Sequence, residues 1–170
     1  EQILDQADEP VRLALTCDTG ITAHEAVEFA QGRGVDVVVT DHHELPPTLP
    51  DAYAVVNPCL LPEGHALGTL PGVGVAYKLA EELYRRVGRP EGSQALLDLV
   101  ALGIVADVAQ QSGETRYLLQ RGLELLRSRP RLGLRVMMEL ADLDPAHLSE
   151  EHIGYLLGPR LNAIGRLGDA

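Results

Sequence analysis

The chain has 170 residues, of which 45% are hydrophobic, and its formal net charge is −11 at pH 7. This length and composition predict one folded domain with a proper core and exclude a disordered chain. The apolar runs are short and interrupted by charge, which excludes a membrane-spanning helix, and the acidic balance argues against a generic basic nucleic-acid-binding surface. The chain opens without a basic, apolar leader and without Met, so we expect a piece of a longer, cytoplasmic protein.

The first half of the chain predicts alternating strands and helices. Residues 11–17 alternate and then run apolar, which predicts a strand ending at Asp18. Thr22 and Glu25 have the spacing of a capping box for a helix to about residue 31, and the β-branched run 35–40 predicts a second strand covered on both faces. A third short strand is expected over residues 52–56. This order implies parallel strands joined by a right-handed crossover.

The second half predicts helices. We expect them over residues 73–87, 93–105, 114–126, 132–140 and 149–157, the last with an acidic start. The long loop 46–71 holds six prolines, and such loops are often functional. The glycine-rich run 158–169 is interpreted as a polar loop. The predicted fold is therefore α/β, with a parallel sheet flanked by helices in residues 1–60 and a mostly helical part in residues 72–170.

Asp41, His42 and His43 follow the second strand directly. A carboxylate beside imidazoles makes a mixed oxygen and nitrogen site for a divalent metal. In an extended segment adjacent side chains point to opposite sides, so one histidine would share a metal with Asp41 and the other would support it or bind substrate. The triplet alone is equally typical of a water-exposed pair of loop histidines.

Two further carboxylates are candidate metal ligands. Asp18 closes the first strand, and the ends of parallel strands lie together at the ligand-binding edge of an open α/β sheet. Taken alone, Asp18 would be a turn former before Thr19 and Gly20. Asp107 lies in an apolar run, where a carboxylate needs a partner; a metal is one, and a hydrogen bond at a helix end is the other.

Three weaker features complete the set. Gly72 and Gly74 open a helix, which allows close approach of an anion or, equally, close helix packing. The C-terminal run carries Arg160, Asn162 and Arg166, which could hold a phosphate. The two cysteines, Cys17 and Cys59, fit no metal-ligand spacing; a disulfide is one alternative, and we expect them instead to be reduced and buried.

Taken together, these residues resemble the DHH phosphoesterase superfamily, and within it the RecJ single-strand exonucleases. The motifs occur in the order of the family and cover almost the whole chain, so the set is far more specific than any one of them. The matching runs are residues 16–21, 37–44, 57–58, 72–79, 101–108 and 158–169.

The resemblance implies a nuclease that needs Mn²⁺ or Mg²⁺, bound as two ions in the complete enzyme, and that digests single-stranded DNA in the 5′→3′ direction during recombination and repair. By position, Asp18, Asp41, His42 and Asp107 would be metal ligands, and His43 would support them or contact the scissile phosphate. The arginines and asparagine of the C-terminal run would lie near the nucleic acid. The resemblance also implies a single-strand-binding protein and a helicase as partners, and no membrane.

The chain departs from the family pattern in lacking the Asp-x-Asp motif of an earlier strand, the second domain and the nucleic-acid-binding module. We therefore expect the fragment alone to be inactive and to bind metal weakly. Two other functions within the superfamily remain open: a phosphatase of short oligonucleotides or small phosphoesters, and a non-catalytic scaffold in a replication or repair complex. A flavodoxin-like anion-binding domain is a further alternative, which would show no metal dependence.

Overall fold

The computed structural model describes residues 10–167, with side chains to residue 163. Its sheet has three strands in the order β1-β2-β3, and both pairs are parallel. The strands are β1 (Leu13–Cys17), β2 (Asp36–Thr40) and β3 (Ala54–Val56), all within the predicted ranges. The parallel sheet flanked by helices is confirmed.

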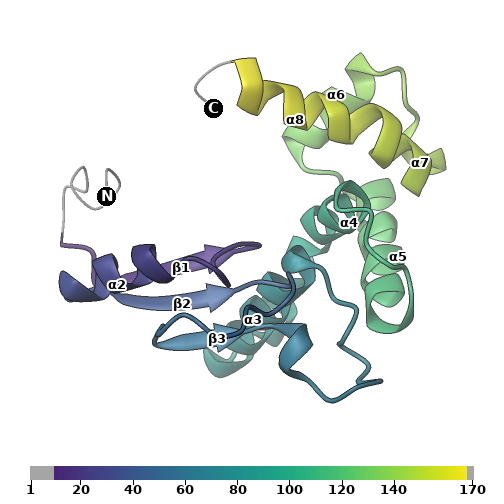
Figure 1. Ribbon diagram of the computed structural model, residues 1–170. Helices are drawn as coiled ribbons and strands as arrows, with labels where there is room; N and C mark the ends of the chain where they lie inside the picture. The colour runs from purple at the N-terminus through teal and green to yellow at the C-terminus, as the bar shows by residue number, and fades with distance from the viewer. Residues whose placement is uncertain (1–9, 168–170) are drawn as a thin grey trace.

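Helix α2 (His24–Gly32) connects β1 to β2 and packs on the sheet (Figure 1). Val27 and Ala30 of α2 form a buried cluster with Val35, Val37 and Val39, which is why the β-branched run forms a covered strand. The predicted capping box was wrong, because α2 begins two residues after Thr22 and Ala23 occupies the N-cap without a side-chain hydrogen bond.

A second and larger hydrophobic cluster holds the helical half together. It is built mainly from α4 and α5, with fully buried side chains such as Ile104 and Leu119, and it lies beside the sheet in Figure 1. The helices of this half are α3 (Gly72–Arg86), α4 (Leu97–Ala106), α5 (Gly113–Ser128), α6 (Leu132–Leu140), α7 (Glu150–His152) and α8 (Gly158–Leu167). Short helical turns link them: η1 (Pro58–Leu60), η2 (Pro90–Leu96), η3 (Pro145–His147) and η4 (Ile153–Leu157).

Three expectations need correction, two of them in this half. The helix expected over 93–105 is divided into the 3₁₀ turn η2 and α4. The expected loop 158–169 is helical to Leu167, because α8 continues from the π-helical turn η4 and Pro159 falls in its first turn, where proline is tolerated. The cysteines are free as expected, but Cys17 and Cys59 are exposed rather than buried.

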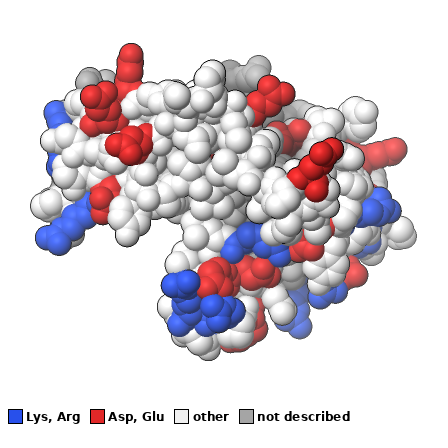
Figure 2. All heavy atoms as spheres, turned by 60° about the horizontal axis from the view of Figure 1, so that its bottom comes forward, with Lys and Arg blue, Asp and Glu red and all other residues white. Residues whose placement is uncertain are grey.

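None of the helices in the described part of the chain is long and apolar enough to cross a membrane. On the face drawn in Figure 2, the basic side chains are not gathered into a track. Figure 2 shows Lys and Arg mixed with Asp and Glu over the helices, and Arg85 and Arg86 both pair with Glu82. This surface agrees with the argument from net charge.

Candidate metal centre

The carboxyl edge of the sheet brings the two acidic turns together. Cys17 and Thr40 are register partners at the ends of β1 and β2, so Asp18 and Asp41 follow them side by side. The Asp18 N–H donates to the carbonyl of Thr40 at 2.9 Å, and Asp18 has a left-handed backbone with φ of 64°. Asp tolerates this conformation better than most residues. Strand order thus correctly predicts that Asp18 and Asp41 lie together.

Asp41 is 1% exposed and faces back into the protein. Its Oδ2 accepts a hydrogen bond from the Ile21 N–H at 2.9 Å. Its Oδ1 accepts from the N–H groups of His42 at 2.8 Å and His43 at 3.3 Å, and from His43 Nδ1 at 2.6 Å. Burial acts to raise the pKa of Asp41, but the hydrogen bonds outweigh it and hold that pKa below its usual value. Asp41 thus fixes the backbone that carries both histidines.

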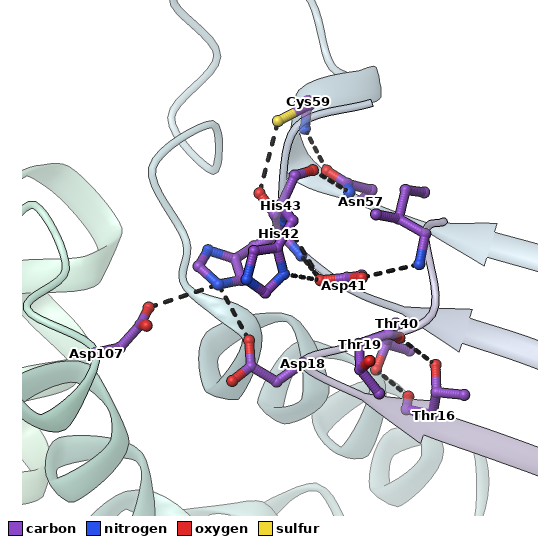
Figure 3. A network of polar contacts seen from close by, with 11 residues as sticks. Thr16, Asp18, Thr19, Thr40, Asp41, His42, His43, Asn57, Cys59 and Asp107 are labelled. Carbon is purple, nitrogen blue, oxygen red and sulfur yellow. Dashed lines mark hydrogen bonds and ion pairs between the residues drawn. The ribbon is translucent and has the colours of Figure 1, made fainter. Parts of the chain in front are cut away.

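His42 lies between two carboxylates (Figure 3). Its Nε2 is 3.0 Å from Asp18 Oδ1 and 3.6 Å from Asp107 Oδ2. This nitrogen is buried and has no hydrogen-bond partner among the described residues, although the Asp18 carboxylate lies within ion-pair distance of it. A buried polar nitrogen without a hydrogen bond is costly. Two carboxylates converging on an imidazole nitrogen are a donor set that a divalent cation fits.

Asp107 reaches this cluster from the helical half. It is the C-cap of α4, and the chain then turns through Val108, which has a left-handed φ of 53°. Val108 N–H donates to the Val105 carbonyl and Ala109 N–H to the Ile104 carbonyl, the two bonds of a Schellman motif. A β-branched residue in the left-handed region costs about 1–2 kcal/mol. Strain of this kind is often found at functional sites.

His43 is the more exposed histidine, with 60% of its side chain accessible. The hydrogen bond from its Nδ1 to the Asp41 carboxylate raises the pKa of His43 above its ordinary value. The two imidazole centroids are 4.5 Å apart, so the rings are neighbours, because the segment turns instead of continuing as a strand. Asp18, His42 and His43 each present a ligand atom within 4.8 Å of the others.

Two residues that contact the site were given little or no role in the sequence analysis. Asn57 is 4% exposed; its Nδ2 donates to the His43 carbonyl at 3.0 Å and its Oδ1 accepts from the Cys59 N–H at 2.8 Å. Gly72 opens α3 directly against Asp18, and a Cβ there would overlap the Asp18 carboxylate. Of the two explanations for Gly72, close packing is therefore the one the contacts support.

The C-terminal candidates lie on α8. Arg160 is exposed, and its Nη1 donates to the Leu156 carbonyl at 2.5 Å. Asn162 lines a cavity beside the Asp107 turn. The side chain of Arg166 lies outside the described part. No contact links Arg160 or Asn162 to the Asp18, His42 and Asp107 cluster among the described residues.

Comparison with known proteins identifies relatives of this chain. The chain is 42% identical over 158 residues to the single-stranded-DNA-specific exonuclease RecJ of Bacillus subtilis strain 168, covering 93% of this chain and 20% of the relative. It is 40% identical over 181 residues to the protein of the same name from Salmonella typhimurium LT2, covering 99% of this chain and 31% of the relative. The chain thus spans a fifth to a third of these relatives.

Solved structures of RecJ proteins also resemble this chain. A crystal structure of exonuclease RecJ bound to manganese matches with a TM-score of 0.82 and 34% identity, over 99% of this chain and 41% of that chain. RecJ of Thermus thermophilus with Mn²⁺ matches with a TM-score of 0.81 and 34% identity, over 98% and 24%. The Mg²⁺ complex from the same organism gives 0.67 and 32%, over 92% and 21%.

A family model agrees with these likenesses. The model described as the N-terminal domain of the DHH family matches residues 2–104, a range that contains Asp18, Asp41, His42 and His43. This is more than half of the chain, so the chain belongs to the DHH family.

Proposed function

We propose that the full-length protein is a divalent-metal-dependent exonuclease that digests single-stranded DNA in the 5′→3′ direction. The relatives that carry this name match nearly the whole chain, and the RecJ structures that it resembles contain Mn²⁺ or Mg²⁺. The single observation that carries the proposal is His42 Nε2, which is buried, has no hydrogen bond and is faced by two carboxylates.

In this proposal Asp18, His42 and Asp107 hold the metal. The carboxylate oxygens suit Mn²⁺ or Mg²⁺, and imidazole nitrogen is a common ligand of transition metals. Bound metal would supply a hydroxide nucleophile at neutral pH and neutralise charge on the phosphodiester. Asp41 stays a predicted ligand, but both of its oxygens already accept hydrogen bonds from the protein, so its described contacts favour support of the two histidines.

The remaining groups of the site would handle substrate. His43 is exposed, has a raised pKa and lies beside His42, so in its protonated form it can donate a hydrogen bond to a phosphate oxygen. Arg160, Asn162 and Arg166 would contact the DNA from α8. We also propose a cytoplasmic location, with a single-strand-binding protein and a helicase as partners, because these provide and expose the proposed substrate.

The test is metal-dependent turnover by the full-length protein. With Mn²⁺ it should release mononucleotides from 5′-phosphorylated single-stranded DNA and leave blunt duplex intact. Asp18→Asn and Asp107→Asn should each reduce kcat/KM at least about 100-fold, because even partners that only support a ligand cost 10- to 100-fold. Asp51→Asn, an exposed carboxylate change, should keep the wild-type rate.

The rival functions predict different results. A phosphatase of short oligonucleotides or small phosphoesters would lose activity as the DNA is lengthened. A scaffold would show no turnover with any metal. Wild-type rates in both aspartate variants would refute the proposed metal centre.

A further inference from the structure

An open cavity of about 430 Å³ lies against the turn that carries Asp107. One wall is the turn after α4, with Ala106 and Val108 on either side of Asp107. The facing wall is η4 and the start of α8, including Tyr155 and Asn162. Asp107 itself points from this turn to His42 (Figure 3). The turn that carries Asp107 therefore lines this cavity and also contributes to the candidate metal centre.

The rim of the cavity presents apolar surface to solvent. Tyr155 is 80% exposed and Val108 is 89% exposed. Tyr155 lies in the π-helical turn η4, a rare element that is frequent at functional sites. Gly154 precedes it, and a Cβ there would be 3.4 Å from Val105 Cγ1, so η4 passes close to α4. An exposed aromatic ring on a packed turn is a preformed stacking surface.

The polar groups in the lining suit a neutral heterocycle rather than a phosphate. Gln111 and Asn162 contribute amides that can both donate and accept. Glu150 and Glu151 contribute carboxylates, and no Lys or Arg is among the lining residues of the described chain. Glu150 is held in place by Gln120 Nε2, which donates to its Oε1 at 3.1 Å. Phosphate would be repelled here, whereas the amino groups of a base would find acceptors.

We propose that this cavity binds one nucleobase of the DNA strand being cleaved, with Tyr155 stacking on the base and the amides and carboxylates facing its edge. This inference rests on the proposed function, because it takes its ligand from the substrate of the metal centre. Stacking is tolerant of sequence, so the site would hold the strand in position without selecting a base. The base would lie in the cavity, and the phosphates of the strand would stay outside it.

The experiment uses the full-length protein and 5′-phosphorylated single strands that carry one abasic residue, moved along the strand a position at a time. For the wild type, KM should rise when the abasic residue falls at the one position that occupies the cavity. Tyr155→Ala should raise KM for normal DNA about 5- to 100-fold, the usual effect of losing one aromatic stacking partner. The same variant should be insensitive to an abasic residue at that position.

Two variants separate stacking from folding. Tyr155→Phe keeps the ring and should retain a KM close to that of the wild type. Tyr53→Ala removes a comparably exposed tyrosine (74%) just before β3, at the end of that strand away from the metal centre, and should change neither KM nor the abasic profile. A merely structural Tyr155 would affect all substrates alike, abasic ones included.

Failure of this inference and failure of the proposed function give different patterns. If the wild type shows no metal-dependent hydrolysis, the proposed function fails, and the cavity is then tested by fluorescence anisotropy of the same strands without added metal. In either assay, an abasic profile that is flat in the wild type, or identical in the wild type and Tyr155→Ala, overturns the base site. A cavity covered by another part of the protein would give that flat profile.

Discussion

At the scale of single residues, Asp41 shows how a buried carboxylate can hold the two neighbouring histidines in place. Its side chain is 1% exposed, and it accepts hydrogen bonds from Ile21, His42 and His43. A carboxylate that accepts several backbone N–H groups is strongly favoured in its charged form. The lowered pKa of Asp41 is the result, and the position of both imidazoles depends on it.

Asp41→Asn should therefore destabilise the metal-free protein by about 2–3 kcal/mol. The amide has one acceptor oxygen, so its NH₂ group would face an N–H donor of the protein, and a buried donor would lose its partner. Chemical denaturation measures the loss. Asp36→Asn makes the same change at the exposed start of β2 and should stay within about 0.5 kcal/mol of the wild type.

The lowered pKa of Asp41 determines how the stability loss in Asp41→Asn depends on pH. A group whose pKa is lower in the folded state contributes stability above its unfolded pKa, and this contribution is lost as the pH falls through the folded pKa. The difference between the wild type and Asp41→Asn should therefore shrink on acidification. If Asp41→Asn is as stable as Asp36→Asn but loses metal affinity, Asp41 is a ligand and not a support.

At the scale of secondary-structure elements, the start of α3 sets the position of Asp18. Gly72 is the first residue of α3, and an added Cβ would lie 2.5 Å from Asp18 Cγ and 2.6 Å from its Cβ. Rotation of the carboxylate cannot relieve the contact with Cβ. The helix and the β1 turn would have to separate, which would move Asp18 from His42.

Gly72→Ala should lower Mn²⁺ affinity by about 10- to 100-fold, the range seen when residues that support a ligand are changed. Isothermal titration with Mn²⁺ measures this effect. Gly133→Ala, at the second position of α6, is the matched control, because a Cβ there meets nothing within 4 Å. It should bind Mn²⁺ normally and gain up to about 1 kcal/mol of stability. Equal affinities in the two variants would show that the Gly72 contact does not position Asp18.

The same scale shows what sequence patterns predict well. The three strands were located because β-branched, buried runs such as 35–40 have few alternatives, and the parallel order follows from the crossover. The ends of helices were harder. Gly34 and Gly88 stop α2 and α3 with a left-handed residue, as expected of glycine, but Val108 takes the same role after α4, where the sequence offers no such indication.

At the scale of the whole molecule, the candidate metal centre lies between two hydrophobic clusters. Asp18 and His42 follow strands β1 and β2 of the sheet that packs with α2, and Asp107 ends a helix of the larger helical cluster. The pairing of Asp18 with Asp41 could be predicted from strand order. The approach of Asp107 to His42 could not, because it depends on how α4 packs against α3 and α5; only the resemblance to a family placed it in the site.

This arrangement predicts that metal binding stabilises the fold across the two clusters. Ligands that bind only the folded state raise stability by mass action, about 2.7 kcal/mol at a concentration 100 times the dissociation constant. Mn²⁺ added to the metal-free protein should raise its melting temperature in differential scanning fluorimetry, and EDTA should reverse the change.

Asp107→Asn tests whether the two clusters share the ion. Its carboxylate is partly exposed and has no hydrogen bond to lose among its described contacts, so in EDTA the variant should melt close to the wild type. With Mn²⁺ the variant should lose most of the rise in melting temperature, because Asp18 and His42 alone would then hold the ion. Asp51→Asn should keep the full increase. If Asp107→Asn keeps it as well, the ion is bound without the helical half, and the 3.6 Å approach of Asp107 to His42 is packing and not ligation.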